Sequence, residues 1–290
     1  MIDRARALRP LLAKNALQSE QDRRAHEENI DAISKAGLFR LMVPQRLGGH
    51  QGNMRTHLEV TAALAESCGG TAWVTALTNV CAWFVGLYPR QAQEEVFGAT
   101  PDARVAGVFT PSTDTRRVEG GLVISGKWYW SSGSLHADWV TVGVIEHDQH
   151  GAFVGQYLAL VPRTEITIED TWYTVGMRAS GSNCVVAKEV FVPDHRLLDI
   201  RAAVNSDYPT EFKGEAEYRA PFVPVAALVL VGAQLGIGRA ALNYVIEKAP
   251  QRAIAYTSFD KQTSSVMFQA QVAEAAQKIH TAHLHAFRAA

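Results

Sequence analysis

The sequence is poor in cysteine and lacks an excess of either charge. Its three cysteines, Cys68, Cys81 and Cys184, form no Cys-x-x-Cys pair, which argues against a zinc ribbon or a disulfide framework and favours a reducing compartment. The formal net charge is −1, so no field of one sign attracts nucleic acid or an anionic membrane. The charged N-terminus lacks the apolar core of a signal peptide. We therefore expect a cytoplasmic protein that binds neither nucleic acid nor membrane.

Motifs for several common chemistries are also missing. The chain has no Gly-x-x-x-x-Gly-Lys-Ser/Thr phosphate loop and no Gly-x-Ser-x-Gly elbow, which argues against a P-loop nucleotidase and a serine hydrolase of that type. His280, His283 and His285 have no carboxylate at ligand spacing, so we interpret them as solvated histidines and expect no metal site.

Two segments rich in small and apolar residues have competing interpretations. Gly236 to Ala241 matches a dinucleotide-binding pattern, but no βαβ unit surrounds it, and small residues at this spacing also let two helices approach closely. The uncharged run from Ala220 to Gly238 approaches the ~20 residues of a membrane span. Because prolines and glycines interrupt that run, we interpret it as a helix buried in protein.

Hydrophobic periodicity divides the chain into three parts. Residues 1–103 show helical spacing, 104–216 show short strand-like runs separated by turn residues, and 217–290 return to helical spacing, with long candidates over 221–248 and 267–288. The short connections in the middle part predict an antiparallel sheet or a small barrel. The fold class is therefore α+β.

The most informative stretch runs from Ser125 to Trp139. It reads Ser-Gly-Lys-Trp-Tyr-Trp-Ser-Ser-Gly-Ser-Leu-His-Ala-Asp-Trp. A strand rich in tryptophan that ends in serines and a glycine offers an aromatic wall beside hydroxyls and closely approaching backbone, which suits a flat ring that forms hydrogen bonds. An aromatic core strand that ends in a turn would show the same residues.

This stretch resembles the flavin-contacting strand of the acyl-CoA dehydrogenase superfamily. Its Trp-Ser-Ser-Gly-x-x-His-Ala-x-Trp form is similar to the flavin-dependent monooxygenase branch. The segment from Asp170 to Arg196 is similar to the end of that family's β-domain, and Gly37 to Gly49 and Thr71 to Val74 are similar to its N-terminal domain. The resemblance implies an N-terminal helical domain, a central antiparallel β-barrel domain and a C-terminal helical bundle.

The resemblance also implies roles for individual residues. Trp130 matches the aromatic residue that packs on the flavin ring, and Ser132 matches the hydroxyl residue near its N5 atom. Phe109 and Thr110 match the strand end beside the pyrimidine side of the ring. Further matching positions in the cofactor site are Ser131, Arg178 and Ser182. His136 is a candidate for polarising a phenolic substrate.

Two activities of this superfamily compete. Its dehydrogenases carry Thr-Glu-Pro-Gly-Ala-Gly-Ser-Asp, where residues 110–114 read Thr-Pro-Ser-Thr-Asp. The resemblance therefore favours the oxygenase component of a two-component monooxygenase: a separate reductase would deliver reduced FMN or FAD, which would react with O2 to a C4a-hydroperoxide and hydroxylate a small aromatic substrate. Ser132 would slow the loss of peroxide as a fixed donor in a water-poor pocket. An acyl-CoA dehydrogenase-type oxidoreductase and a truncated, non-catalytic member remain alternatives.

The C-terminal domain is shorter than the resemblance implies. Members of the family close with a four-helix domain that forms the core of a homotetramer, whereas only residues 217–290 follow the β-domain here. We expect a truncated bundle, with the substrate-activating histidine base in the absent portion.

Overall fold

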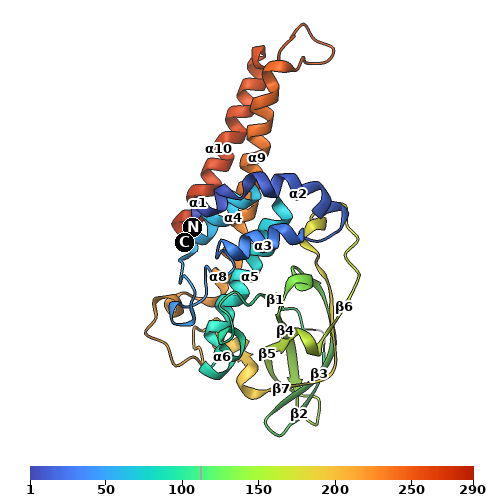
Figure 1. The fold of residues 1–290 in the computed structure, drawn as a ribbon, viewed down its shortest axis with the longest axis vertical. Coiled ribbons are helices and arrows are strands. Elements are labelled where there is room, and N and C mark those ends of the chain that lie inside the picture. Colours follow the sequence, from blue (N-terminus) through green and yellow to red (C-terminus); the bar gives the residue numbers. More distant parts are fainter. Residues whose placement is uncertain (112) are drawn as a thin grey trace.

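The computed structural model describes residues 1–111 and 113–290, and it begins with a helical part. Ser112, which belongs to the segment compared with the dehydrogenases, lies outside the described residues. The N-terminal helices surround α5, whose side chains are largely buried (Figure 1). Asn53 begins α4 by accepting a hydrogen bond from the Thr56 amide at 2.9 Å. The helices of this part are α1 (Ile2–Ala7), α2 (Arg9–Gln21), α3 (Glu27–Lys35), α4 (Met54–Ala65), α5 (Gly69–Leu87) and α6 (Arg90–Phe97).

The described residues of the middle part form eight strands in two four-stranded sheets, with orders β1-β4-β5-β8 and β2-β3-β7-β6. Apolar side chains from both sheets meet in one core around Trp128, whose indole nitrogen donates to the Gly143 carbonyl at 2.8 Å. The strands are β1 (Val105–Val108), β2 (Thr113–Val118), β3 (Gly121–Ser131), β4 (Trp139–His147), β5 (Phe153–Pro162), β6 (Thr167–Glu169), β7 (Asn183–Pro193) and β8 (Leu197–Asp199).

The α+β architecture is confirmed, with one correction in the β-domain. The described strands form two sheets, not one closed barrel. The expectation that all strands pair antiparallel is also wrong, because β1 and β4 are parallel, with Val105 opposite Trp139. The chain between these strands contains the β2–β3 hairpin, so it is long enough to return to the same edge and run again in the same direction.

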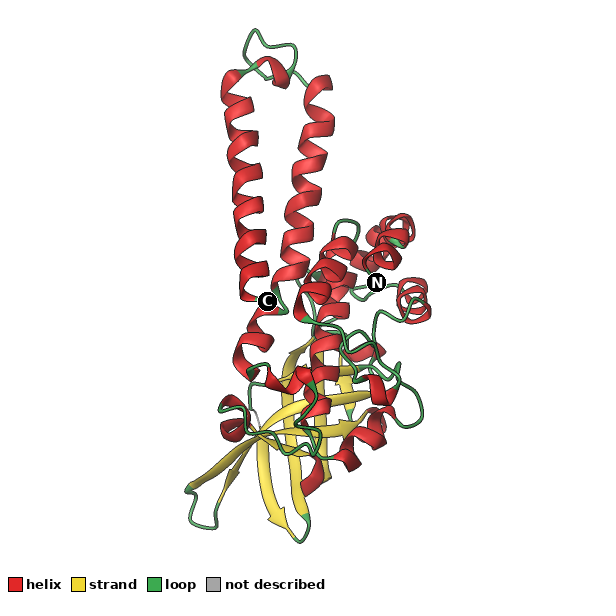
Figure 2. Ribbon diagram, turned by 90° about the vertical axis from the view of Figure 1, so that its left-hand side faces the viewer, coloured by secondary structure: helices red, strands yellow, loops and turns green. Residues whose placement is uncertain are grey.

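The C-terminal part is a pair of long helices that projects from the rest of the molecule (Figure 2). The pair consists of α9 (Val231–Lys248) and α10 (Val266–Ala289). The shorter α8 (Phe222–Leu228) precedes it, and α7 (Ile200–Val204) follows β8 at the end of the middle part. Where α9 crosses α4, a Cβ atom added to Gly236 would lie 2.1 Å from the Ala62 carbonyl oxygen. Close helix packing is therefore the role of the glycine pattern, as predicted, and no dinucleotide-binding unit surrounds it in the part of the chain that the structure describes.

Two helical regions among the described residues have the length and apolar composition of a membrane span. They are Gly69–Leu87, in which 83% of the most apolar stretch is buried, and Phe222–Gln251, in which 33% of it is buried. The predicted run 220–238 is not one helix, because it is divided between α8 (Phe222–Leu228) and the first half of α9 (Val231–Lys248). One side of it is buried as predicted, through Phe222, Val225, Val229, Ala233 and Leu235. Only the first half of α9 packs against the body, because the helix then extends beyond α4 beside α10.

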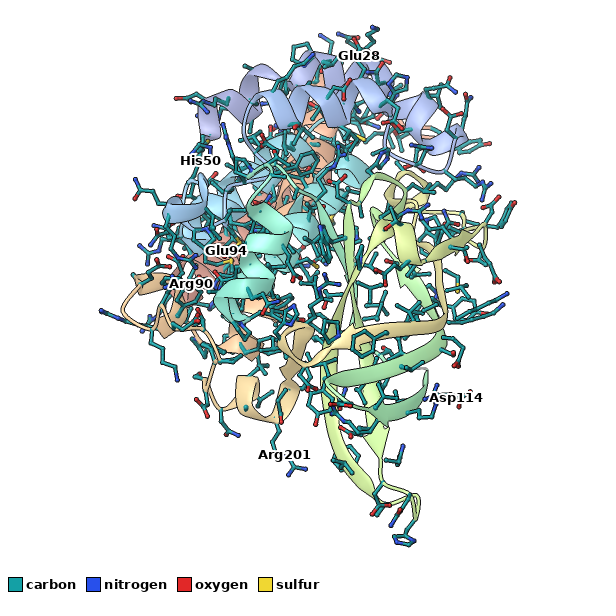
Figure 3. The ribbon with its side chains drawn as sticks, turned by 60° about the horizontal axis from the view of Figure 1, so that its bottom comes forward. Glu28, His50, Arg90, Glu94, Asp114 and Arg201 are labelled. Carbon is teal, nitrogen blue, oxygen red and sulfur yellow. The ribbon has the colours of Figure 1, made fainter. Side chains whose placement is uncertain are left out.

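Charged side chains are spread over the outer surface. Glu28 on α3, the neighbouring Arg90 and Glu94 on α6, and Arg201 on α7 are all exposed (Figure 3). Acidic and basic groups alternate among them, in agreement with the balanced net charge of −1.

Candidate functional site

The end of β3 is irregular at the predicted aromatic residue. Trp128 pairs with Val185 and Ser131 with Asn183, so two residues of β3 lie opposite one residue of β7. This bulge gives Trp130 a left-handed φ of 68°. Strict alternation would bury Trp130 beside Trp128. Instead, 69% of Trp130 is exposed while Trp128 is buried, so the bulge turns a large aromatic ring outward.

A chain of hydrogen bonds holds the Ser132 hydroxyl. It accepts from the Trp73 indole nitrogen at 3.1 Å and lies 2.7 Å from the Ser182 hydroxyl. The Ser182 hydroxyl in turn lies 2.6 Å from that of Ser180. A hydroxyl has one proton and two lone pairs. If the protons point from Ser180 to Ser182 and on to Ser132, the Ser132 proton is free to donate to a bound molecule.

Packing of α5 against the loop before β7 brings these groups together. A Cβ atom on Gly70 would lie 2.5 Å from the Cβ of Ala179, so only glycine permits this approach of α5 to the short helix η4 (Arg178–Ser180). Trp73 follows one turn later on α5 and reaches Ser132. The sequence motifs did not predict this contact, because the two residues are 59 positions apart.

Backbone and hydroxyl groups next to Ser132 complete the arrangement. Gly133 has a φ of 75°, and its amide donates to the Ser180 carbonyl at 3.0 Å. The hydroxyls of Ser131 and Ser134 are buried without a hydrogen-bond partner among the described residues. We call Trp130 to Gly133, with Ser180 and Ser182, the β3 edge. An outward aromatic ring beside unpaired hydroxyls fits a flat ring system with polar atoms on its rim, as an isoalloxazine has.

The side chains of three other predicted residues make no described hydrogen bond or ring contact with the β3 edge. The ring of Phe109 packs against Phe84 and Phe222, with centroids 4.9 and 6.1 Å apart, and its carbonyl oxygen lies against Gly143, where an added Cβ atom would be 2.0 Å away. Thr110 is exposed. The Arg178 guanidinium donates to the Glu20 carbonyl at 2.8 Å and so joins η4 to α2.

His136 lies in the short helix η2 (Ser134–His136) and faces the N-terminal helices. Its Nδ1 atom is 3.5 Å from both Arg24 and Glu27, and no described contact joins it to Ser132. Burial lowers the pKa of His136 to about 4, with Glu27 opposing this shift and Arg24 adding to it. The imidazole is therefore neutral at pH 7.

No group of three or more potential metal ligands occurs among the described residues. Of the three C-terminal histidines, His283 is not simply solvated, because its ring stacks on Phe287 at 4.1 Å and lies 3.6 Å from Glu59. This corrects the interpretation of His283, whereas His280 and His285 are exposed as predicted.

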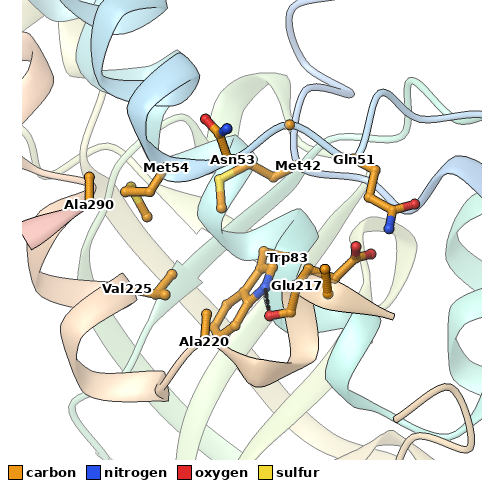
Figure 4. Close-up of a pocket in the computed structure, with 11 residues that line it drawn as sticks. Met42, Gln51, Asn53, Met54, Trp83, Glu217, Ala220, Val225 and Ala290 are labelled. Carbon is orange, nitrogen blue, oxygen red and sulfur yellow. Dashed lines mark hydrogen bonds between the residues drawn. The ribbon is translucent and has the colours of Figure 1, made fainter. Parts of the chain in front are cut away.

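Sequence reasoning did not identify Glu217, a carboxyl group that lines a pocket separate from the β3 edge. Glu217 lines a pocket of about 250 Å³ beside Trp83, between the N-terminal helices and α8 (Figure 4). It lies in a segment that reads as a polar loop, and no motif surrounds it.

The chain matches two family profiles that together span more than half of its length. The profile described as "Acyl-CoA dehydrogenase, N-terminal domain" matches residues 5–98, and "Acyl-CoA dehydrogenase, C-terminal domain" matches residues 228–290.

Individual relatives are named as oxygenase components. The chain is 32% identical to the flavin-dependent monooxygenase oxygenase subunit HsaA of Rhodococcus jostii, over 97% of this chain and 74% of the relative. It is 29% identical to the oxygenase component of p-hydroxyphenylacetate 3-hydroxylase of Acinetobacter baumannii, over 89% of this chain and 61% of the relative. The structure of XiaF from Streptomyces in complex with FADH2 and glycerol aligns with a TM-score of 0.92 at 33% identity, over 99% of this chain and 72% of that one. The chain therefore belongs to the acyl-CoA dehydrogenase family, within its branch of flavin-dependent monooxygenase oxygenase components.

Proposed function

We propose that this protein hydroxylates a small aromatic substrate with reduced FAD and O2, and that a separate flavin reductase supplies the reduced cofactor. The observation that carries the proposal is the β3 edge, where the bulge exposes the Trp130 ring beside the held hydroxyl of Ser132. The reaction balances when one oxygen atom of O2 enters the substrate and the other leaves as water, with both electrons taken from the reduced flavin.

The residues of the β3 edge have distinct tasks in this proposal. Trp130 provides a face on which the flavin ring stacks, and the Ser131 and Ser132 hydroxyls form hydrogen bonds to its rim. When bound, the reduced flavin supplies the electrons that activate O2. Ser132 holds a proton at a fixed atom, because Trp73 and Ser182 fix its oxygen. Such a preoriented donor stabilises developing negative charge without having to reorganise.

The choice of cofactor rests on the relatives. Those above 25% identity whose names state a cofactor are an FADH(2)-dependent resorcinol hydroxylase component, 28% identical, and XiaF, 33% identical and described with FADH2. These names support FAD over FMN. The names of the resorcinol and p-hydroxyphenylacetate hydroxylases also support a phenolic ring as the substrate.

The remaining parts of the proposal concern organisation. The division into domains 1–103, 104–216 and 217–290 is supported by the change from helices to strands after α6 and back after β8. A homotetramer is supported by exposed apolar side chains on the projecting helices, among them Ile237, Val245 and Leu284. A cytoplasmic location is supported by three free, buried cysteines.

The first test is anaerobic equilibrium dialysis with reduced FAD and with reduced FMN. We expect Trp130→Ala to weaken binding of reduced FAD by about 1–3 kcal/mol, or roughly 5- to 150-fold in Kd, the usual contribution of aromatic stacking. Phe191→Ala is the matched control, because Phe191 is an exposed aromatic of the neighbouring strand away from the β3 edge. Equal losses in both variants, or no binding of either reduced flavin, would contradict the proposal.

A second test measures the reaction class. After O2 is admitted to the protein loaded with reduced FAD, at least one phenol of a panel should be hydroxylated, with product formed in proportion to the reduced flavin consumed. A chain that binds reduced FAD but releases only hydrogen peroxide with every phenol would contradict the hydroxylase proposal while leaving the flavin site intact.

A further inference from the structure

A cavity of about 250 Å³ lies apart from the β3 edge. Apolar groups of Met42, Met54, Trp83 and Val225 line it, together with the carboxyl group of Glu217 (Figure 4). Trp83 follows Trp73 on α5 by ten residues, which places it about 15 Å further along the helix than the residue that contacts Ser132, at ~1.5 Å per residue. The cavity is therefore a second site and does not depend on the flavin proposal.

The Glu217 carboxyl group has no ion-pair partner among the described residues. Both of its oxygens are shielded from solvent and make no hydrogen bond of normal geometry, although the Gln51 side chain and the Glu217 backbone amide lie close enough to stabilise its charge. The nearby cation, Arg46, is already engaged: its Nε atom donates to Glu215 at 2.9 Å and its Nη2 atom to the Tyr218 hydroxyl at 3.2 Å. With Arg46 paired to Glu215, an ionised Glu217 leaves a net charge of −1 in this region.

The surroundings of Glu217 make its ionised form costly. Burial raises its pKa to about 7, and the charge of Glu215 raises it further, while the Glu217 backbone amide, the Gln51 side chain and the charge of Arg46 oppose the shift by smaller amounts. Burial also raises the pKa of the neighbouring Tyr218, so its phenol stays neutral. A buried carboxylate without a counter-ion is stabilised most by a cation that it can contact directly.

We propose that this cavity binds a small organic ammonium ion with an apolar body. The ammonium group would contact the Glu217 carboxylate, and the body would lie against Trp83 and the two methionines. An indole face attracts a cation, and methionine side chains adapt to apolar ligands of different shape. A neutral alcohol of the same size should bind more weakly, because it carries no positive charge to offset the net charge of −1 in this region.

The test is isothermal titration calorimetry with benzylamine, using benzyl alcohol as the neutral match. We expect benzylamine to bind about tenfold more tightly at pH 8 than at pH 6, because the ionised fraction of Glu217 changes by that factor around a pKa of about 7. Glu217→Gln should weaken benzylamine binding by at least about tenfold. Glu119→Gln, which removes an exposed carboxylate in the β2–β3 turn, should leave it unchanged.

A measurement on the unaltered protein keeps the proposal testable if the variant folds poorly. At pH 7, binding of the ammonium should release about half a proton from Glu217, detected as a dependence of the binding enthalpy on the ionisation enthalpy of the buffer. Absence of proton release would overturn the proposal, as would equal binding of benzyl alcohol. Loss of benzylamine binding in Trp130→Ala but not in Glu217→Gln would place the amine at the β3 edge and would also overturn it.

Discussion

Replacing Ser132 by alanine tests the hydrogen-bond chain of the β3 edge. The change removes the acceptor of the Trp73 indole N–H and the partner of the Ser182 hydroxyl, which lie 3.1 and 2.7 Å from the Ser132 oxygen. Ser132 is 8% exposed, so water cannot fully replace these bonds. We expect a loss of about 1–3 kcal/mol in the free energy of unfolding, the usual cost of leaving buried partners unsatisfied.

A double-mutant cycle with Trp73→Phe isolates the indole–hydroxyl bond. Each single variant loses this bond, so the double variant should be less destabilised than the sum of the singles by about 1 kcal/mol. Urea denaturation of the four proteins measures this difference. Ser125→Ala is the control, since Ser125 lies on β3, the strand that leads to Ser132, and its hydroxyl pairs with exposed Glu189. Additive effects of Trp73→Phe and Ser132→Ala would show that the bond does not form in solution.

The same variant also has a functional readout. If Ser132 holds a proton for the bound flavin, Ser132→Ala should consume reduced flavin with less product and more hydrogen peroxide than the Ser125→Ala control. Unchanged coupling in Ser132→Ala would refute the catalytic role while leaving the structural role of the hydroxyl in place.

Two further predictions concern stability. Burial lowers the pKa of His57 from 6.5 to about 4. Between these two pH values the unfolded chain binds a proton at His57 and the folded chain does not, so the free energy of unfolding falls as the pH drops towards 4. His57→Gln should remove about 3 kcal/mol of this loss in the free energy of unfolding, measured by denaturation at pH 6.5 and at pH 4. An unchanged pH dependence of stability in the variant would contradict the assignment. Gly236→Ala should cost about 1–3 kcal/mol because its Cβ would meet the Ala62 carbonyl. Gly238→Ala, whose Cβ would lie 3.5 Å from Ile279, should be neutral or stabilising by up to ~1 kcal/mol. Equal effects of both glycine variants in thermal unfolding would disprove the packing of α9 on α4.

Local periodicity predicted one of the two long C-terminal helices as a single element, whereas the other, predicted over 221–248, is divided into α8 (Phe222–Leu228) and α9 (Val231–Lys248). Residues 267–288 were predicted as one helix, and α10 spans Val266–Ala289. The register of the sheets could not be predicted in the same way. The parallel pairing of β1 with β4 depends on how the intervening hairpin folds back, and the bulge at Trp130 depends on which residue of β7 lies opposite. Neither is encoded in the alternation of a single strand.

The candidate site was predicted in part. The family resemblance named Ser132 and Ser182, and the structure places their hydroxyls in contact. It could not name Trp73 as their partner, because that contact arises from the packing of α5 against η4. Arg178 and His136 belong to the same sequence segments, but tertiary packing directs both side chains towards the N-terminal helices. Glu217 gives no signal in the sequence, because its unusual protonation results from burial beside Glu215.

The backbone at Trp130 has a consequence for attempts to engineer this chain. A left-handed φ of 68° costs an L-residue roughly 1 kcal/mol that glycine does not incur. Glycine would relieve this strain, but it loses about 0.5–1 kcal/mol more conformational entropy on folding, so the exchange should change stability little while deleting the aromatic face. A search for thermostable variants that scores melting temperature alone would not detect that loss, so any such search needs flavin binding as a simultaneous criterion.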